Sequence, residues 1–377
     1  MSKTSKKNTG LSVDKNWWRQ AAIYQIYPRS FADSNGDGMG DLPGISSRLG
    51  YLRDLGIDAL WLSPIYRSPM RDGGYDVADP RDVDPIFGDL SDFDALLHAT
   101  HRGGMRLITD IVPNHVSDQH LWFQEALGAG PGSAQWARFH VLEGKDGGPP
   151  NNWRSVFGDI AWTAMPGHDG WWYLNLFDST QPDVNWTNPE VSADFTQTLR
   201  FWFDRGVDAF RIDVATALTK PTDYPDAFYS DSVDGVDSEL ASVVPYFDRD
   251  DVHEVWRSWR RVADEYDGDR AFVAEAWVDD VVRQAAYTRP DELHTAFNFV
   301  ALHSPWEIQG LREVIDDSLR TAAAVGAPAT WVLSNHDVVR PVTRFAPKTD
   351  DGELDIEQGR RRSLALSLTF LALPGSC

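Results

Sequence analysis

Short apolar, β-rich runs alternate along this chain with segments of helical periodicity. The runs predicted as strands lie at 21–27, 57–64, 105–113, 207–213, 271–277, 295–300 and 330–335. Amphipathic helices are predicted at 48–57, 93–104, 194–206, 253–266 and 358–373. Strands that alternate with helices in this way favour parallel βαβ units, and therefore an α/β barrel.

The pattern breaks between residues 114 and 182. This stretch is rich in Gly, Pro, Trp and Asn and has no sustained helical period. Because a connection this long is usually functional, we interpret 114–182 as a small insertion domain over the active site. The barrel is then formed by 17–113 and 183–377, and residues 1–16 are predicted to be a disordered tail.

Composition narrows the class of partner. The formal charge is 35 minus 57, or −22, which argues against nucleic acid and anionic membranes because no basic stripe is present. A neutral, hydroxyl-rich partner agrees better with 45 aromatic residues, 16 of them Trp. One Cys rules out an internal disulfide, and no signal peptide or membrane span is apparent, so the expected compartment is the cytoplasm. The oligomeric state is left open.

Three acidic residues close predicted strands. Asp213, Glu275 and Asp337 each follow a short apolar, β-rich run, within the segments VDAFRID, AFVAEAW and TWVLSNHD. A carboxylate at the C-terminal end of a barrel strand points into the mouth where active sites of (β/α)8 barrels lie. Any one of these acids alone would be interpreted as a solvated carboxylate at the end of a strand. Together, beside Arg211 and His336, they predict glycosidic bond cleavage by a proton donor and a nucleophile.

The motifs around these acids resemble a known family. DIVPNH (110–115), GVDAFRIDVA (206–215), EAW (275–277) and NHD (335–337) look like the four ordered signature segments of glycoside hydrolase family 13, the α-amylase superfamily. QPDVNW (181–186) resembles a fifth segment in the form typical of its α-glucosidase and oligo-1,6-glucosidase branch. The resemblance runs from about residue 17 to the C-terminus, and it implies a TIM (β/α)8-type barrel with an insertion after the third strand.

That resemblance implies a role for each acid. Asp213 is the expected nucleophile, Glu275 the expected general acid and base, and Asp337 the expected stabiliser of the transition state. Arg211 lies two residues before Asp213 on the same strand, so it shares its face and is expected to hold Asp213 anionic. Retention of anomeric configuration follows if the two carboxyl groups lie about 5 Å apart.

The resemblance also implies a set of sugar-binding residues. Asp110 and Asn114 are interpreted as supports of the loop after the third strand, and Arg340 and Arg344 as contacts either to substrate or to acids. The expected substrate-binding residues are Tyr75 as a stacking platform, Asp76 as a sugar-binding acid, His115, Phe177, Arg211 and His336. For Phe177, packing within the insertion is an equal alternative.

A calcium loop is predicted near the N-terminus. DSNGDGMGDL (33–42) places oxygen ligands at alternate positions, which suits hard cations such as Ca2+. It resembles the structural calcium loop of the α-glucosidase branch, with ligands from Asp33, Asn35, Asp37, the Met39 carbonyl and Asp41. The alternative is a metal-free Asp/Gly turn.

The expected activity is hydrolysis of α-1,4 or α-1,6 glucosidic bonds at the non-reducing ends of short oligosaccharides. Val214, directly after the nucleophile, is often associated in this branch with α-1,6 cleavage. A glucosyltransferase or isomerase of the same superfamily is the first alternative, and a non-catalytic carbohydrate-binding relative is the second. Family members continue past LALPGSC, so a missing eighth strand, an open seam beside the first strand and poor activity of this chain alone are expected.

Overall fold

Six parallel strands form the inner sheet of the molecule. The computed structural model describes residues 15–229, 244–278 and 280–377. Within them the strands pair in chain order as β1-β2-β5-β9-β10-β11, each parallel to the next. Their bounds are β1 (Ile23–Ile26), β2 (Ala59–Leu62), β5 (Arg106–Ile111), β9 (Ala209–Ile212), β10 (Ala271–Ala274) and β11 (Thr295–Ala296). Strands β2, β9 and β10 are buried along their whole length, as a sheet with both faces covered requires.

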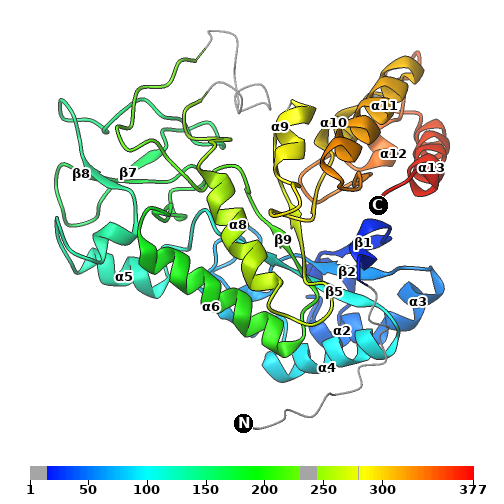
Figure 1. The fold of residues 1–377 in the computed structure, drawn as a ribbon, viewed down its shortest axis with the longest axis horizontal. Coiled ribbons are helices and arrows are strands. Elements are labelled where there is room, and N and C mark those ends of the chain that lie inside the picture. The colour runs from blue at the N-terminus through cyan, green and yellow to red at the C-terminus, as the bar shows by residue number, and fades with distance from the viewer. Residues whose placement is uncertain (1–14, 230–243, 279) are drawn as a thin grey trace.

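Helices cover the outside of this sheet (Figure 1). Each of the five helices predicted from periodicity is present. In chain order the α-helices of the described residues are α1 (Pro28–Phe31), α2 (Leu42–Ser47), α3 (Leu49–Asp54), α4 (Leu90–Arg102), α5 (Leu121–Leu127), α6 (Pro189–Arg205), α8 (Val252–Ala263), α9 (Val281–Ala286), α10 (Phe299–His303), α11 (Ile308–Val325), α12 (Pro341–Arg344) and α13 (Ile356–Ala372). In the described residues, no helix is long and apolar enough to cross a membrane.

The insertion carries its own antiparallel sheet. Strands β6 (Val141–Glu143), β8 (Trp171–Leu174) and β7 (Trp162–Ala164) pair in that order, and a hairpin of β3 (Tyr66–Arg67) and β4 (Asp79–Val83) lies before it in the chain. Its hydrophobic cluster also includes Val214, Ala217 and Tyr246, which follow β9. The insertion therefore shares its core with the segment behind the predicted nucleophile.

The last two predicted strands are shorter than expected. The run 295–300 forms two residues of β11, after which Asn298 accepts the Ala301 amide at 2.9 Å and starts α10. The run 330–335 makes only a bridge from Thr330 to Ser376. Asn335 Oδ1 accepts the amides of Asp337 and Val338, and such side-chain turns compete with strand pairing. The prediction of a seventh strand was therefore wrong for the described structure.

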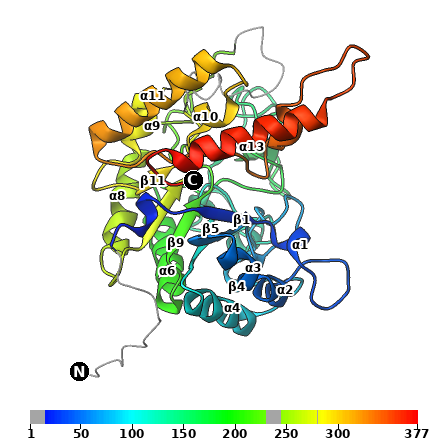
Figure 2. The same cartoon turned by 90° about the vertical axis from the view of Figure 1, so that its right-hand side faces the viewer.

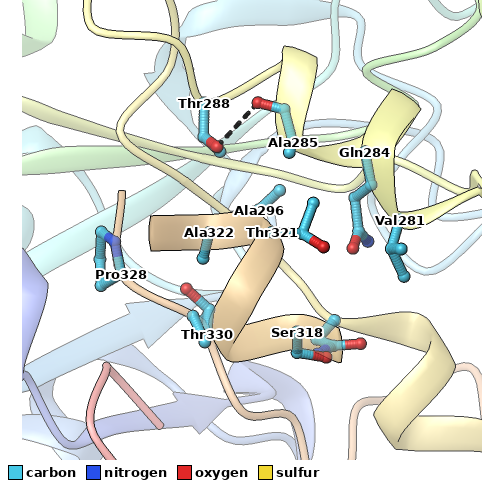
Figure 3. Close-up of a pocket in the computed structure, with 12 residues that line it drawn as sticks. Val281, Gln284, Ala285, Thr288, Ala296, Ser318, Thr321, Ala322, Pro328 and Thr330 are labelled. Carbon is cyan, nitrogen blue, oxygen red and sulfur yellow. Dashed lines mark hydrogen bonds between the residues drawn. The ribbon is translucent and has the colours of Figure 1, made fainter. Parts of the chain in front are cut away.

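Small side chains surround a cavity where this pairing is weak. The cavity, of about 40 Å³, lies between α9, α11 and residues 328–330 (Figure 3). Its walls include Ala285, Ala322 and Thr288, whose hydroxyl donates to the Ala285 carbonyl. No ionisable side chain lines it, so it is a gap in packing and not a catalytic site.

The expected open seam beside β1 is bridged at one end. The Ser376 amide donates to Ala329 and its carbonyl accepts from Trp331, while the Cys377 amide donates to Ala21 and its carbonyl accepts from Ile23. Figure 2 shows the C-terminus beside β1. Two residues thus occupy the position of an eighth strand between the 329–331 segment and β1.

Gly375 tests how closely this seam is packed. Its φ is 126°, and an added Cβ would meet the Ala329 carbonyl oxygen at 2.2 Å. We expect Gly375→Ala to lower the free energy of unfolding by about 1–3 kcal/mol more than Gly352→Ala. Gly352 is the matched control because its φ is 86° and nothing lies within 4 Å. Urea denaturation measures both, and equal losses would contradict a closed seam.

Candidate active site

One buried arginine joins three carboxylates at the ends of β5, β9 and β10. Arg211 Nη1 lies 2.9 Å from Asp110 Oδ1 and 2.7 Å from Asp213 Oδ1, and Nη2 lies 2.7 Å from Glu275 Oε1. The side chains of Arg211, Asp110, Asp213 and Glu275 are 1%, 0%, 9% and 6% exposed. The sequence therefore placed Arg211, Asp213 and Glu275 correctly on neighbouring strand ends.

Burial favours a retained proton in this cluster. Burial raises the pKa of Asp213 well above its ordinary value; Arg211 opposes the shift, and Glu275 and Asp110 add to it. Burial likewise raises the pKa of Asp110 to about 6, against the pull of Arg211. Arg211 therefore favours the anionic form of Asp213, as expected, while burial and the two neighbouring acids oppose it. One cation faces three carboxylates, so the group as a whole holds a proton more tightly than its members would in water.

Aromatic side chains line the cluster formed by Arg211 and the three carboxylates. Trp61 Nε1 and the Tyr75 hydroxyl both donate to Asp110 Oδ2 at 3.1 Å. The Arg211 guanidinium lies 5.3 Å from the Trp61 ring centroid and 5.5 Å from that of Tyr75. Tyr75 also stacks on His336, with centroids 5.2 Å apart and an interplanar angle of 8°. One face of the expected sugar platform is therefore already covered by His336.

His336 is held neutral at the mouth. Burial lowers its pKa to about 4. Its Nδ1 lies 2.9 Å from the Gln25 amide nitrogen, a donor, so Nε2 carries the proton. Asp337 Oδ1 lies 3.5 Å from that Nε2, and its side chain is 42% exposed. Asp337 therefore lies nearer to solvent than the other two acids.

The loop that carries these two residues is braced by arginines. Arg340 donates to the carbonyls of Asn335 and Val338, and Arg344 donates to the Leu333 carbonyl at 3.0 Å. Both arginines thus support the backbone around His336 and Asp337.

His115 and Phe177 form another wall. Their ring centroids lie 5.0 Å apart, and burial lowers the pKa of His115 to about 3. Beside them is a buried ion pair that the sequence did not reveal. Lys220 Nζ lies 2.8 Å from both Asp183 Oδ2 and Asn114 Oδ1. A lysine is normally exposed, so no sequence signal distinguished this one.

The structure does not leave Asp76 free to bind a sugar. Asp76 is fully buried and accepts hydrogen bonds from the Ser68 hydroxyl and the amides of Arg71 and Asp72. Its carboxylate holds its own loop, which corrects the predicted role. The neighbouring Asp72 instead accepts the Gln181 amide at 2.8 Å and is electrostatically coupled to Asp337.

The predicted calcium loop is ordered by its own hydrogen bonds. The Asp33 carboxylate accepts the amides of Asn35, Gly36 and Gly38, and these bonds hold its pKa below the ordinary value. Asp41 caps α2 through the Gly44 amide and also accepts from Ser34. The oxygen donors suit Ca2+ chemically. Across the described residues, however, no three His, Cys, Asp or Glu side chains are grouped closely enough to hold a metal ion.

Asp72 gives a pH-dependent prediction. Burial raises its pKa to about 6, so the folded protein binds this proton more tightly than the unfolded chain does. Stability is therefore lost as the pH rises from about 4 to 6, and Asp72→Asn should regain about 1–2 kcal/mol at pH 7 and nothing below about pH 4. Urea unfolding at both pH values measures this gain. Asp267→Asn, at an exposed carboxyl, is the control, and no gain at pH 7 would contradict the assignment.

Comparison with known proteins places this site in a family. Residues 25–372 match the model described as "Alpha amylase, catalytic domain". An α-glucosidase of Culex pipiens is 39% identical over 88% of this chain and 58% of its own length. An oligo-1,6-glucosidase of Parageobacillus thermoglucosidasius is 36% identical over 92% of this chain and 62% of its own. The chain thus spans about three fifths of these relatives.

Solved structures agree. An α-glucosyl transfer enzyme superposes with a TM-score of 0.83 at 37% identity, covering 96% of this chain and 67% of that one. A trehalulose synthase superposes with a TM-score of 0.79 at 34% identity, covering 89% and 60%. The chain therefore belongs to the α-amylase catalytic-domain family.

Proposed function

We propose that this chain carries the catalytic site of a retaining α-glucosidase that acts on the non-reducing ends of short oligosaccharides, at α-1,4 or α-1,6 bonds. The observation that supports this most is the single Arg211 guanidinium that binds both Asp213 and Glu275. It holds the two carboxyl groups side by side at the barrel mouth, as a nucleophile and a proton donor must be. Relatives named α-glucosidase, oligo-1,6-glucosidase and maltase support the same class.

Each acid has a separate task in this mechanism. Asp213 attacks the anomeric carbon while Glu275 gives its proton to the leaving oxygen. Glu275 then takes a proton from water, whose oxygen displaces Asp213 and restores the free carboxylate. Asp337 and the Nε2–H of His336 lie at the rim, where they hold sugar hydroxyls as positive charge develops on the ring.

Trapping of the covalent intermediate tests this proposal without fast turnover. Incubation with 5-fluoro-α-glucosyl fluoride should add one 5-fluoroglucosyl unit to Asp213 as the anomeric fluoride leaves, and mass spectrometry of peptides locates the adduct. Asp213→Asn should lose the label and lower turnover of p-nitrophenyl α-glucoside by about a thousandfold or more. Asp267→Asn, a surface carboxyl, should keep both. A label on another residue, or full turnover by Asp213→Asn, would refute the proposed nucleophile.

A transferase or isomerase is the second candidate. The superpositions on an α-glucosyl transfer enzyme and a trehalulose synthase favour it, because such enzymes use the same covalent intermediate with a different acceptor. Product analysis at high sugar concentration separates the two: free glucose supports hydrolysis, and new disaccharides support transfer. The ratio of kcat/KM on isomaltose to that on maltose then measures linkage preference.

We also propose that the loop at 33–41 binds Ca2+ and stabilises the fold. Asp33, Asn35, Asp37, the Met39 carbonyl and Asp41 would hold the ion, which supplies charge to the loop and takes no part in the reaction. Added Ca2+ should raise the Tm of chelator-treated protein by a few degrees. Asp37→Asn keeps the acceptor for the Met39 amide but removes one charge, so it should weaken the effect. No bound cation and no change in Tm would exclude the site.

A further inference from the structure

Val214, the residue after Asp213, has a left-handed backbone. Its φ is 47°, although it is a β-branched residue. For such a residue this region is a genuine outlier, because the branched Cβ crowds the neighbouring backbone. Backbone strain of this kind persists only where several contacts from the surrounding structure hold the residue in that conformation.

The side chain of Val214 lies in a hydrophobic core to which the insertion contributes. It is 7% exposed and belongs to a hydrophobic cluster whose other members come mainly from that region. They include Trp153, Ala161, Trp162, Leu174 and Leu176. The cluster also includes Ala217, Ala227, Val244 and Tyr246, so the Val214 side chain lies in a core shared by the insertion and the segment after β9.

The backbone of Val214 is held by Glu275. Its amide donates to Glu275 Oε2 at 3.0 Å, and the next amide, of Ala215, donates to the Glu275 carbonyl at 2.9 Å. Glu275 Oε1 is bound by Arg211, so Val214 and Arg211 together fix the plane of the carboxyl group. With a negative φ at residue 214, either the amide would leave Glu275 or the side chain would leave the insertion.

We propose that Val214 is a positioning residue, whose left-handed turn is locked by packing into the insertion and aims its amide at Glu275. The insertion thereby sets the orientation of the proton donor relative to Asp213. This inference rests on the proposed glucosidase function. It also makes a prediction that simple packing does not make, because Gly adopts the left-handed region freely whereas Ala does not.

Three substitutions separate backbone strain from packing. Val214→Ala keeps the strained Cβ but removes the anchor, so the turn relaxes and the amide leaves Glu275. Val214→Gly removes the strain as well, so the left-handed turn remains accessible. Val214→Thr keeps the branched shape, so it should keep the wild-type ratio of activities on the two substrates, although its buried hydroxyl lowers the Tm. If packing alone mattered, the loss would follow side-chain size and Gly would be worse than Ala.

The readout compares leaving groups. p-Nitrophenolate departs with little protonation, whereas the glucose leaving from maltose needs the acid. We expect Val214→Ala to lower kcat/KM on maltose about tenfold more than on p-nitrophenyl α-glucoside, and Val214→Gly to stay within about threefold of wild type on both. Leu142→Ala truncates the same cluster without touching either acid, so it should lower the Tm and leave the ratio unchanged.

Two results would overturn the inference: a Gly variant as impaired as the Ala variant, or equal losses on both substrates. If wild type turned over neither glucoside faster than Asp213→Asn, the proposed function would fail instead. In that case the melting temperatures of the variants test the left-handed turn without any activity measurement. A Tm of Val214→Gly above that of Val214→Ala upholds the locked left-handed turn, and the reverse order overturns it.

Discussion

The architecture of the site depends on one guanidinium that cannot reach water. Arg211 is 1% exposed and faces Asp110, Asp213 and Glu275 from three neighbouring strands. Burying this cation is tolerable only because carboxylates surround it, and burying them is tolerable only because it is present. The excess of negative charge, together with burial, raises the pKa of Asp213 and of Asp110 and so favours a retained proton in the cluster.

The barrel and the insertion act on this cluster from different sides. The parallel strands bring the three carboxylates to one edge, since the carboxyl ends of β5, β9 and β10 are in register. The insertion reaches the same edge by sharing a hydrophobic cluster with Val214. Directly after the insertion, Asp183 pairs with Lys220, which also binds Asn114 next to His115. The site is thus supported by contacts between segments far apart in sequence.

Much of the fold and part of the site could be predicted. The alternation of apolar runs and helical segments gave the βα order, because each pattern is set locally by which face is buried. Strands β1, β2, β5, β9 and β10 lie within their predicted runs. The strands in the last two runs are shorter than predicted, because hydrogen bonds from backbone amides to the side chains of Asn298 and Asn335 form turns there. Asp76 and Asp72 stand four residues apart in one loop, and only the folded hydrogen bonds distinguish their roles.

The sequence by itself determined which residues end the strands, and hence that Arg211, Asp213 and Glu275 share one edge of a barrel. Tertiary structure alone decided the rest. It determined that Lys220 is buried, that Val214 has a left-handed backbone and that the Asp76 carboxylate accepts hydrogen bonds from its own loop. It also bridged the seam beside β1 with Ser376 and Cys377. The reason is that periodicity encodes which face of an element is buried, whereas a charge, a strained φ or a seam depends on atoms brought in from distant segments.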